Sequence, residues 1–183
     1  WLAHGAVFAD LLRTHPDQPS RRELNGQRVP WGPELTIDDP DLPAWATAAC
    51  ELYRRQIAVL REWFTNRQFP YGQLGGGWGD DVEILRQWGP FAFISDADPV
   101  VRDGIERLCD GMWRSELEEW GFSPEIGDVE HAAEPSADTV PTMIALRYGD
   151  PLWLERNMKT CRTIRDVYTG IDARGYRRFK SSY

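Results

Sequence analysis

The sequence predicts an all-α protein built from repeated helical hairpins, and three observations predict it. After residue 43, apolar residues recur every three or four positions, which is the spacing of one helix face. No part of that region indicates a β-rich segment. An Asp-Pro pair occurs at residue 98 and again at residue 150, a pair that suits the start of a helix.

Segment 1–42 is expected to be irregular. Prolines are dense between residues 14 and 43, and proline at that density prevents a long helix. The only regular structure expected there is a short helix within residues 1–13 and a short strand pair near Arg28 and Val29.

Segment 43–183 is the predicted hairpin region. Three polar loops, at 69–80, 121–138 and 171–183, separate its helices. Helices are expected over residues 43–67, 81–94, 98–113, 139–148 and 150–170.

An internal repeat links these elements. Asp98-Pro99 recurs as Asp150-Pro151 and Cys109 recurs as Cys161, both after 52 residues, and GDDVE at 79–83 resembles GDVE at 127–130. Each unit is therefore a long helix, a polar loop, a shorter helix and an Asp-Pro turn. Such units stack into an open solenoid or close into a ring, and a unit of about 50 residues favours the ring, an α/α toroid.

A ring of six such hairpins needs about 300 residues, so this chain should carry about half of one. The remainder would come from the parent chain or from a partner.

The composition limits the function. Lys and Arg total 21 against 29 Asp and Glu, giving a net charge of −8, which argues against general nucleic-acid binding and against anchoring on an anionic membrane. No apolar run approaches the roughly 20 residues of a membrane span. Nine tryptophans provide a large core or flat faces for sugar rings. The three cysteines form no zinc framework and are expected to be buried and unpaired.

The first loop, NRQFPYGQLGGGWGDDVE at 66–83, has the composition of a ligand-binding segment. Its glycines, including Gly76 and Gly77, allow close backbone approach to a ligand, and Trp78 is expected at an exposed tip. Asp80, Asp81 and Glu83 follow, where a carboxylate either caps the next helix or serves a ligand. The loop lacks the Lys-Ser/Thr end of a phosphate loop.

The second loop, EIGDVEHAAEPSADT at 125–139, holds His131 among five carboxylates. A carboxylate beside an imidazole raises its pKa, as a general base or acid requires. The alternatives are a hydrogen-bonded structural histidine, or a divalent metal site formed by His131 and Glu134 with Asp128 nearby. Asp138 is expected to cap the following helix.

The third loop, DARGYRRFKSSY at 172–183, is basic, with aromatic residues interleaved. One interpretation is an exposed basic strand. The other is that Arg177, Arg178 and Tyr176 project into the cleft of His131, where arginine would bind a substrate carboxylate or sulfate.

The hairpin repeat and the GGGWGDDVE and DVEHAAEPSADT loops resemble the α/α-toroid carbohydrate-active enzymes, a group of six-hairpin glycosidases and toroid polysaccharide lyases. The resemblance covers residues 43–183. It implies a polysaccharide in a central cleft, tryptophan stacking on pyranose faces and a secreted or periplasmic location. Apart from the possible divalent metal at His131, no cofactor is expected.

Two chemistries fit this class. A hydrolase would place carboxylates on both sides of the glycosidic bond, Asp80 or Asp81 from the first loop and Glu130 or Glu134 from the second. A lyase acting on a uronic-acid polymer would use His131 as base, Tyr176 or Tyr148 as acid, and Arg177 or Arg178 against the substrate carboxylate.

The single histidine and the Arg/Tyr loop favour the lyase narrowly. The hydrolase and a non-catalytic glycan- or protein-binding repeat are the alternatives. The residues expected to contact substrate are Trp78, Gly76, Gly77, Glu83, Glu134, Arg177, Arg178 and Tyr148.

Overall fold

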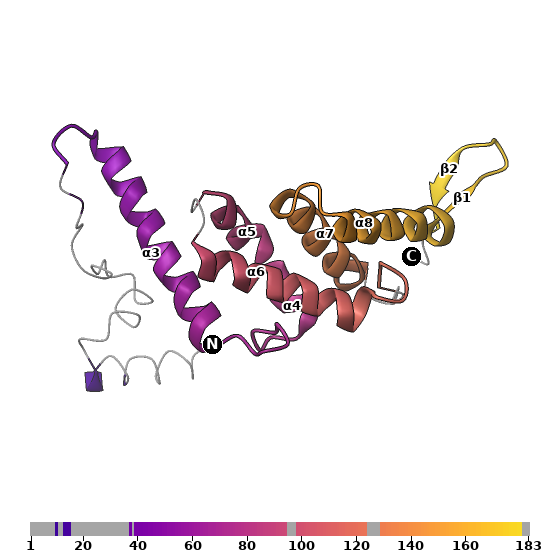
Figure 1. Ribbon diagram of the computed structural model, residues 1–183. Helices are drawn as coiled ribbons and strands as arrows, with labels where there is room; N and C mark the ends of the chain where they lie inside the picture. The colour runs from indigo at the N-terminus through magenta and orange to yellow at the C-terminus, as the bar shows by residue number, and fades with distance from the viewer. Residues whose placement is uncertain are drawn as a thin grey trace. The chain divides into compact units, whose positions relative to one another are not determined.

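The computed structural model describes residues 10, 13–15, 37, 39–94, 98–123 and 129–180, without the side chains of 129–132, and it is mostly helical (Figure 1). The chain divides into two units, Trp1–Leu52 and Tyr53–Tyr183, with the boundary inside a long helix. The expected strand pair near Arg28 and most of the expected helix within 1–13 lie outside the described residues.

Helices dominate the second unit, and the predicted all-α class is confirmed. The helix predicted over 43–67 is present, as are the two that follow the Asp-Pro pairs. The elements are α3 (Ala44–Asn66), α4 (Trp78–Glu83), α5 (Leu85–Ile94), α6 (Pro99–Met112), the π-helical turn η1 (Trp113–Leu117), α7 (Val129–Leu146), α8 (Pro151–Thr163), the π-helical turn η2 (Ile164–Tyr168), β1 (Thr169–Ile171) and β2 (Arg177–Phe179).

The two Asp-Pro pairs begin α6 and α8 in the same way. Asp98 has extended backbone angles and accepts hydrogen bonds from two N–H groups of the first turn, and Asp150 does the same. Proline occupies the next position in both helices, where its missing N–H costs nothing. Each helix then continues into one π-helical turn, η1 or η2.

The single helix predicted over 81–94 is wrong in its details. The chain enters α4 at Trp78 and breaks at Ile84 before α5. Gly77 occupies the N-cap position of α4 and has no side chain to cap it, so the local signal is limited to the acidic residues Asp80 and Asp81 of the first turn.

The predicted loop over 121–138 is also wrong, because α7 begins at Val129 and carries His131, Glu134 and Asp138. Pro135 lies inside this helix, where proline normally costs about 3 kcal/mol. Glu134, Pro135 and Ser136 are all buried, so packing against the rest of the unit offsets that cost.

The last loop contains a short antiparallel hairpin, with Thr169 paired to Phe179 and Ile171 to Arg177. The sequence indicated no β-rich segment after residue 43, and this hairpin corrects that expectation for the end of the chain. The Asp172 carboxylate accepts hydrogen bonds from the N–H groups of Arg174 and Tyr176 and so forms the turn. β2 is exposed along its length, as the strand interpretation of this segment expects.

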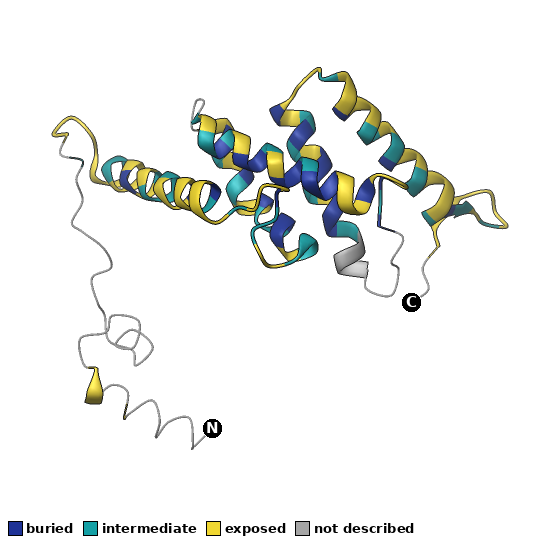
Figure 2. Ribbon diagram, turned by 60° about the horizontal axis from the view of Figure 1, so that its bottom comes forward, coloured by how far each residue is buried: buried dark blue, intermediate teal, exposed yellow. Residues whose placement is uncertain are grey.

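The core lies where α4, α5 and α7 pack against α6 (Figure 2). Two glycines of α6 allow close approach, because a Cβ at Gly104 would lie 2.2 Å from the Phe64 ring and one at Gly111 would lie 2.2 Å from the Tyr71 carbonyl oxygen. The fully buried apolar side chains include Leu60, Val82, Val101, Ile105, Leu108, Met112, Leu117 and Met143. Among the described helices, none is both long and apolar enough to cross a membrane.

All three cysteines are free, as predicted, but only Cys109 is buried. Cys50 and Cys161 are exposed, which corrects the expectation for both. Cys161 lies on the exposed face of α8, whereas Cys109 faces the core from α6.

Candidate functional site

Asp81 organises the glycine-rich loop that leads into α4. Its carboxylate, in a residue only 5% exposed, accepts hydrogen bonds from the N–H groups of Leu74 at 2.6 Å, Gly75 at 3.2 Å and Gly76 at 2.9 Å. Gly75 and Gly77 have positive φ, which glycine adopts without steric cost. Both oxygens of Asp81 are engaged by the loop backbone, so its role is to hold the loop in shape.

Trp78 is not at an exposed tip, which corrects the sequence prediction. Its ring packs over Gly111 of α6, where an added Cβ would lie 2.6 Å from the indole. The edge of the same ring meets Tyr71, with centroids 6.1 Å apart. The exposed rings of this loop belong to Phe69 and Tyr71 instead.

Beyond this loop, α4 packs beside α7, and charged side chains meet there. Arg86 donates from Nε to Asp138 Oδ1 at 3.0 Å and from NH2 to Glu134 Oε1 at 3.0 Å. Glu83 Oε1 lies 3.6 Å from NH1 of the same guanidinium. We call Glu83, Arg86, Glu134 and Asp138 the acidic cluster. Glu134 and Asp138 are almost enclosed, with side chains 3% and 10% exposed, while Glu83 and Arg86 are about half exposed.

Two carboxyl groups of the acidic cluster, those of Glu83 and Glu134, affect each other's surroundings. Glu134 Oε2 is buried, and no donor among the described residues reaches it. The pKa of Glu83 is raised above its ordinary value of 4.5, first by a hydrogen bond with Glu134 and then by repulsion from the same group. Two carboxyl groups share a hydrogen bond only when one is protonated, so the closeness of Glu134 favours the protonated form of Glu83. Glu83 is the more exposed of the two, so a proton on Glu83 would be accessible to a ligand.

Arg86 is fully engaged in the cluster. Its pKa is raised, chiefly by the hydrogen bond with Asp138 and next by the one with Glu134. A guanidinium held by two carboxylates in this way is a fixed countercharge for the cluster.

The structure therefore brings together two predicted site residues, Glu83 and Glu134, from the two predicted loop regions. Asp80 lies three residues before Glu83 in α4, is exposed, and its charge contributes to raising the pKa of Glu83. His131 lies three residues before Glu134 in α7. The side chains of His131 and Glu130 lie outside the described atoms.

Sequence reasoning missed Arg86 and the structural role of Asp138, which was expected only to cap a helix. A signal was present, because Arg86 and Asp138 carry opposite charges and are 52 residues apart, the same spacing that separates the two Asp-Pro pairs of the sequence.

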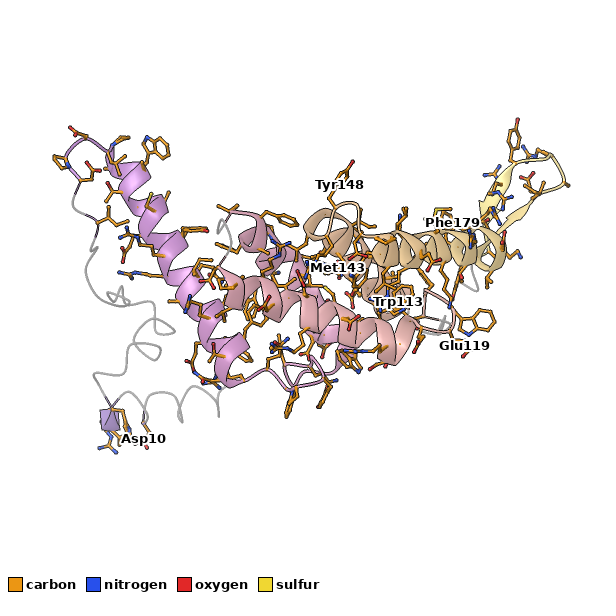
Figure 3. All side chains as sticks on the ribbon, viewed as in Figure 1. Asp10, Trp113, Glu119, Met143, Tyr148 and Phe179 are labelled. Carbon is orange, nitrogen blue, oxygen red and sulfur yellow. The ribbon has the colours of Figure 1, made fainter. Side chains whose placement is uncertain are left out.

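Tyr148 is not part of this group. It follows the C-terminal end of α7 and is 93% exposed, pointing away from the helices in Figure 3. From Glu134 to the helix end at Leu146 the chain rises about 18 Å, at about 1.5 Å per residue. Tyr148 thus lies beyond the C-terminal end of α7, whereas the acidic cluster contacts the first half and the middle of that helix.

The arginines of the hairpin contact residues close to them in sequence. Arg177 donates to Thr169 Oγ1 at 2.7 Å and to the Arg165 carbonyl at 3.0 Å. Arg178 donates to Asp172 at 3.0 Å and lies over the exposed ring of Tyr176. These contacts place the predicted Arg/Tyr group at the C-terminal end of α8 rather than at the acidic cluster (Figure 1).

Within the described residues, no group of three or more His, Cys, Asp or Glu side chains is arranged to hold a metal ion. The metal site considered for His131 with Asp128 involves atoms outside that part of the chain. A comparison of the chain with protein-family models, with curated proteins and with solved structures finds no match.

Proposed function

We propose that this chain is the catalytic part of a glycoside hydrolase of the α/α-toroid type, with Glu83 as its general acid. The observation that carries this proposal is the position of the half-exposed Glu83 beside the buried Glu134, which raises the pKa of Glu83. A glycosidase needs one carboxyl group that stays protonated near neutral pH so that it can protonate the leaving oxygen. Glu134 supplies a neighbour that favours the protonated form of Glu83, and Arg86 anchors Glu134.

Asp80 is the second carboxylate in this proposal. Glu83 and Glu134 cannot straddle a glycosidic bond themselves, because hydrogen-bonded oxygens lie within about 3 Å of each other. Asp80 and Glu83 are three positions apart in α4, a spacing that puts their Cβ atoms about 5–6 Å apart on one helix face. From such positions the two carboxyl groups can adopt the separation of roughly 5–5.5 Å that a retaining pair requires, with Asp80 as nucleophile.

The charges at the acidic cluster favour hydrolysis over β-elimination. A lyase acting on a uronic-acid polymer needs a cation for the substrate carboxylate. Arg86 already binds Glu134 and Asp138, and Arg177 and Arg178 bind acceptors near the hairpin. The lyase with His131 as base and Tyr176 as acid is thus the second candidate, and the product distinguishes the two.

The toroid part of the proposal is supported by contacts that recur along the chain. A Cβ at Gly72 would lie 2.4 Å from the Arg107 carbonyl oxygen, and one at Gly121 would lie 2.8 Å from the Thr160 nitrogen and 3.1 Å from the Lys159 carbonyl carbon. Arg107 and Lys159 are 52 residues apart, as are the capping residues of α6 and α8. In each case the loop after one long helix packs on the next long helix, so we propose successive hairpins of one ring, completed by the parent chain or a partner.

The test is a cleavage assay on neutral and uronic-acid polysaccharides that measures new reducing ends and ultraviolet absorbance together. A hydrolase gives reducing ends without absorbance, and Glu83→Gln and Asp80→Asn should each lower kcat about 10²–10⁴-fold. Glu155→Gln, an exposed glutamate of α8, is the matched control and should leave kcat unchanged.

Ultraviolet absorbance that rises with each cleavage would show that the product is unsaturated. The hydrolase proposal would then be wrong, and the lyase would take its place. Full activity in Glu83→Gln would remove Glu83 from the chemistry.

A further inference from the structure

The turn that precedes the glycine-rich loop carries two aromatic rings on the surface. Phe69 and Tyr71 are 45% and 52% exposed, and their rings stack with centroids 5.3 Å apart and planes 10° from parallel. Parallel rings at that separation are offset, so part of each ring face is left uncovered by the other. Each ring of the pair therefore leaves apolar surface exposed to solvent.

The sequence fixes the backbone beneath these rings. Phe69-Pro70-Tyr71-Gly72 has proline second and glycine fourth, the signature of a tight turn, and the Gly72 N–H donates to the Phe69 carbonyl at 2.9 Å. Gly72 has a φ of 119° and lies against the Arg107 carbonyl, where no side chain would fit.

Gln68 ties this turn to α6. Its Nε2 donates to the carbonyls of Gly72 at 2.9 Å and Gly104 at 2.8 Å, and its Oε1 accepts from Arg107 at 3.0 Å. The Gln68 side chain therefore holds the turn through both the nitrogen and the oxygen of its amide. Rings on such a support lose little conformational entropy when a ligand covers them.

The rings and the proposed acid are linked through α4. Tyr71 contacts Trp78, the first residue of α4, and Glu83 lies five residues further along that helix, a rise of about 7.5 Å and a turn of about 140° round the axis. A polysaccharide of several sugar units is long enough to reach from Glu83 to the rings.

We infer that Phe69 and Tyr71 form a stacking platform for a pyranose ring of the substrate, the role that the sequence assigns to Trp78. This inference rests on the proposed function, because it takes the ligand to be a polysaccharide. The apolar face of a pyranose has the size and shape of an aromatic ring and covers the pair without requiring any hydrogen bond from it.

The experiment measures binding of cellohexaose, xylohexaose, mannohexaose and oligogalacturonate to the full 183-residue chain by calorimetry. Phe69→Ala and Tyr71→Ala should each weaken binding of the preferred oligosaccharide roughly 3- to 10-fold, while Tyr71→Phe retains it. The matched controls Phe179→Ala and Trp120→Ala remove exposed rings elsewhere, 77% and 46% exposed, and should have no effect. Thermal unfolding checks that all variants are folded.

Three results would be decisive. Unchanged affinity in both Phe69→Ala and Tyr71→Ala, in a chain that binds and cleaves a glycan, overturns the platform and leaves the hydrolase proposal standing. Loss of affinity in those variants, in a chain that binds without cleaving, supports the platform and overturns the hydrolase. Failure of the wild-type chain to bind any of the four oligosaccharides overturns both.

Discussion

Replacing Asp81 by asparagine tests whether its carboxylate has a structural or a catalytic role. In the wild-type chain the Asp81 carboxylate accepts three backbone hydrogen bonds, two at one oxygen and one at the other. An amide of the same shape retains one oxygen, so it can keep the pair from Leu74 and Gly75 but turns an NH2 group toward the N–H of Gly76.

The cost follows from these bonds. Losing the bond from Gly76 to a charged acceptor costs about 1.5–3 kcal/mol, and the other two weaken by about 1 kcal/mol together when their acceptor becomes neutral. Asp81→Asn should therefore lower the free energy of unfolding by about 2.5–4 kcal/mol, a large part of the 5–15 kcal/mol typical of a domain.

Urea denaturation followed by circular dichroism measures this difference, and the neighbouring Asp80→Asn is the matched control. Asp80 is exposed, so its replacement should cost at most about 1 kcal/mol. The reasoning is refuted if Asp81→Asn unfolds at the wild-type urea concentration, and a simultaneous loss of cleavage would then make Asp81 a catalytic residue.

Two further predictions concern the thiols and the acidic cluster. Iodoacetamide should label Cys50 and Cys161 in the native chain but Cys109 only after denaturation, because burial excludes the reagent and raises the pKa of the Cys109 thiol; mass spectrometry showing equal labelling of all three would contradict the fold. The raised pKa of Glu83 means that the native state holds its proton more tightly than the unfolded chain, so this contribution to stability is complete below the ordinary pKa of 4.5 and is lost as pH rises through the raised pKa. Urea midpoints across that pH range should fall less steeply in Glu83→Gln, which cannot ionise, and equal slopes in the two proteins would disprove the raised pKa of Glu83.

The parts of the fold that could be predicted from sequence are those with local signals. Asp98 and Asp150 predict the starts of α6 and α8, because the capping residue, the proline and the first apolar residues lie within four positions of one another. The start of α4 could not be predicted, because Gly77 offers no side chain to cap it. The start of α7 could not be predicted, because Pro135 indicates that no helix passes through this position. The cost of this proline is offset by its burial against other parts of the fold, and that burial cannot be read from the local sequence.

The candidate site shows the same division. The carboxylates themselves are visible in the sequence, and Glu83 and Glu134 were among the expected substrate contacts. Their pairing was not visible, because it depends on α4 lying beside α7 and on Arg86 reaching across between them. The distinct roles of Asp80 and Asp81 could not be predicted either, since neighbouring positions on a helix point in directions about 100° apart and only packing decides which one is buried.

The charge balance of the acidic cluster links the fold to the proposed chemistry. Three ionised carboxylates beside one guanidinium would carry a net charge of −2, and a proton on Glu83 would reduce this to −1. The cluster joins α4 and α5 to α7, so loss of such a proton would both weaken the contact between these helices and remove the proposed general acid. The pH dependence of stability and the high-pH limb of kcat/KM should therefore be governed by the same pKa. Two clearly different values would mean that the proton on Glu83 is structural and that the catalytic acid is another group.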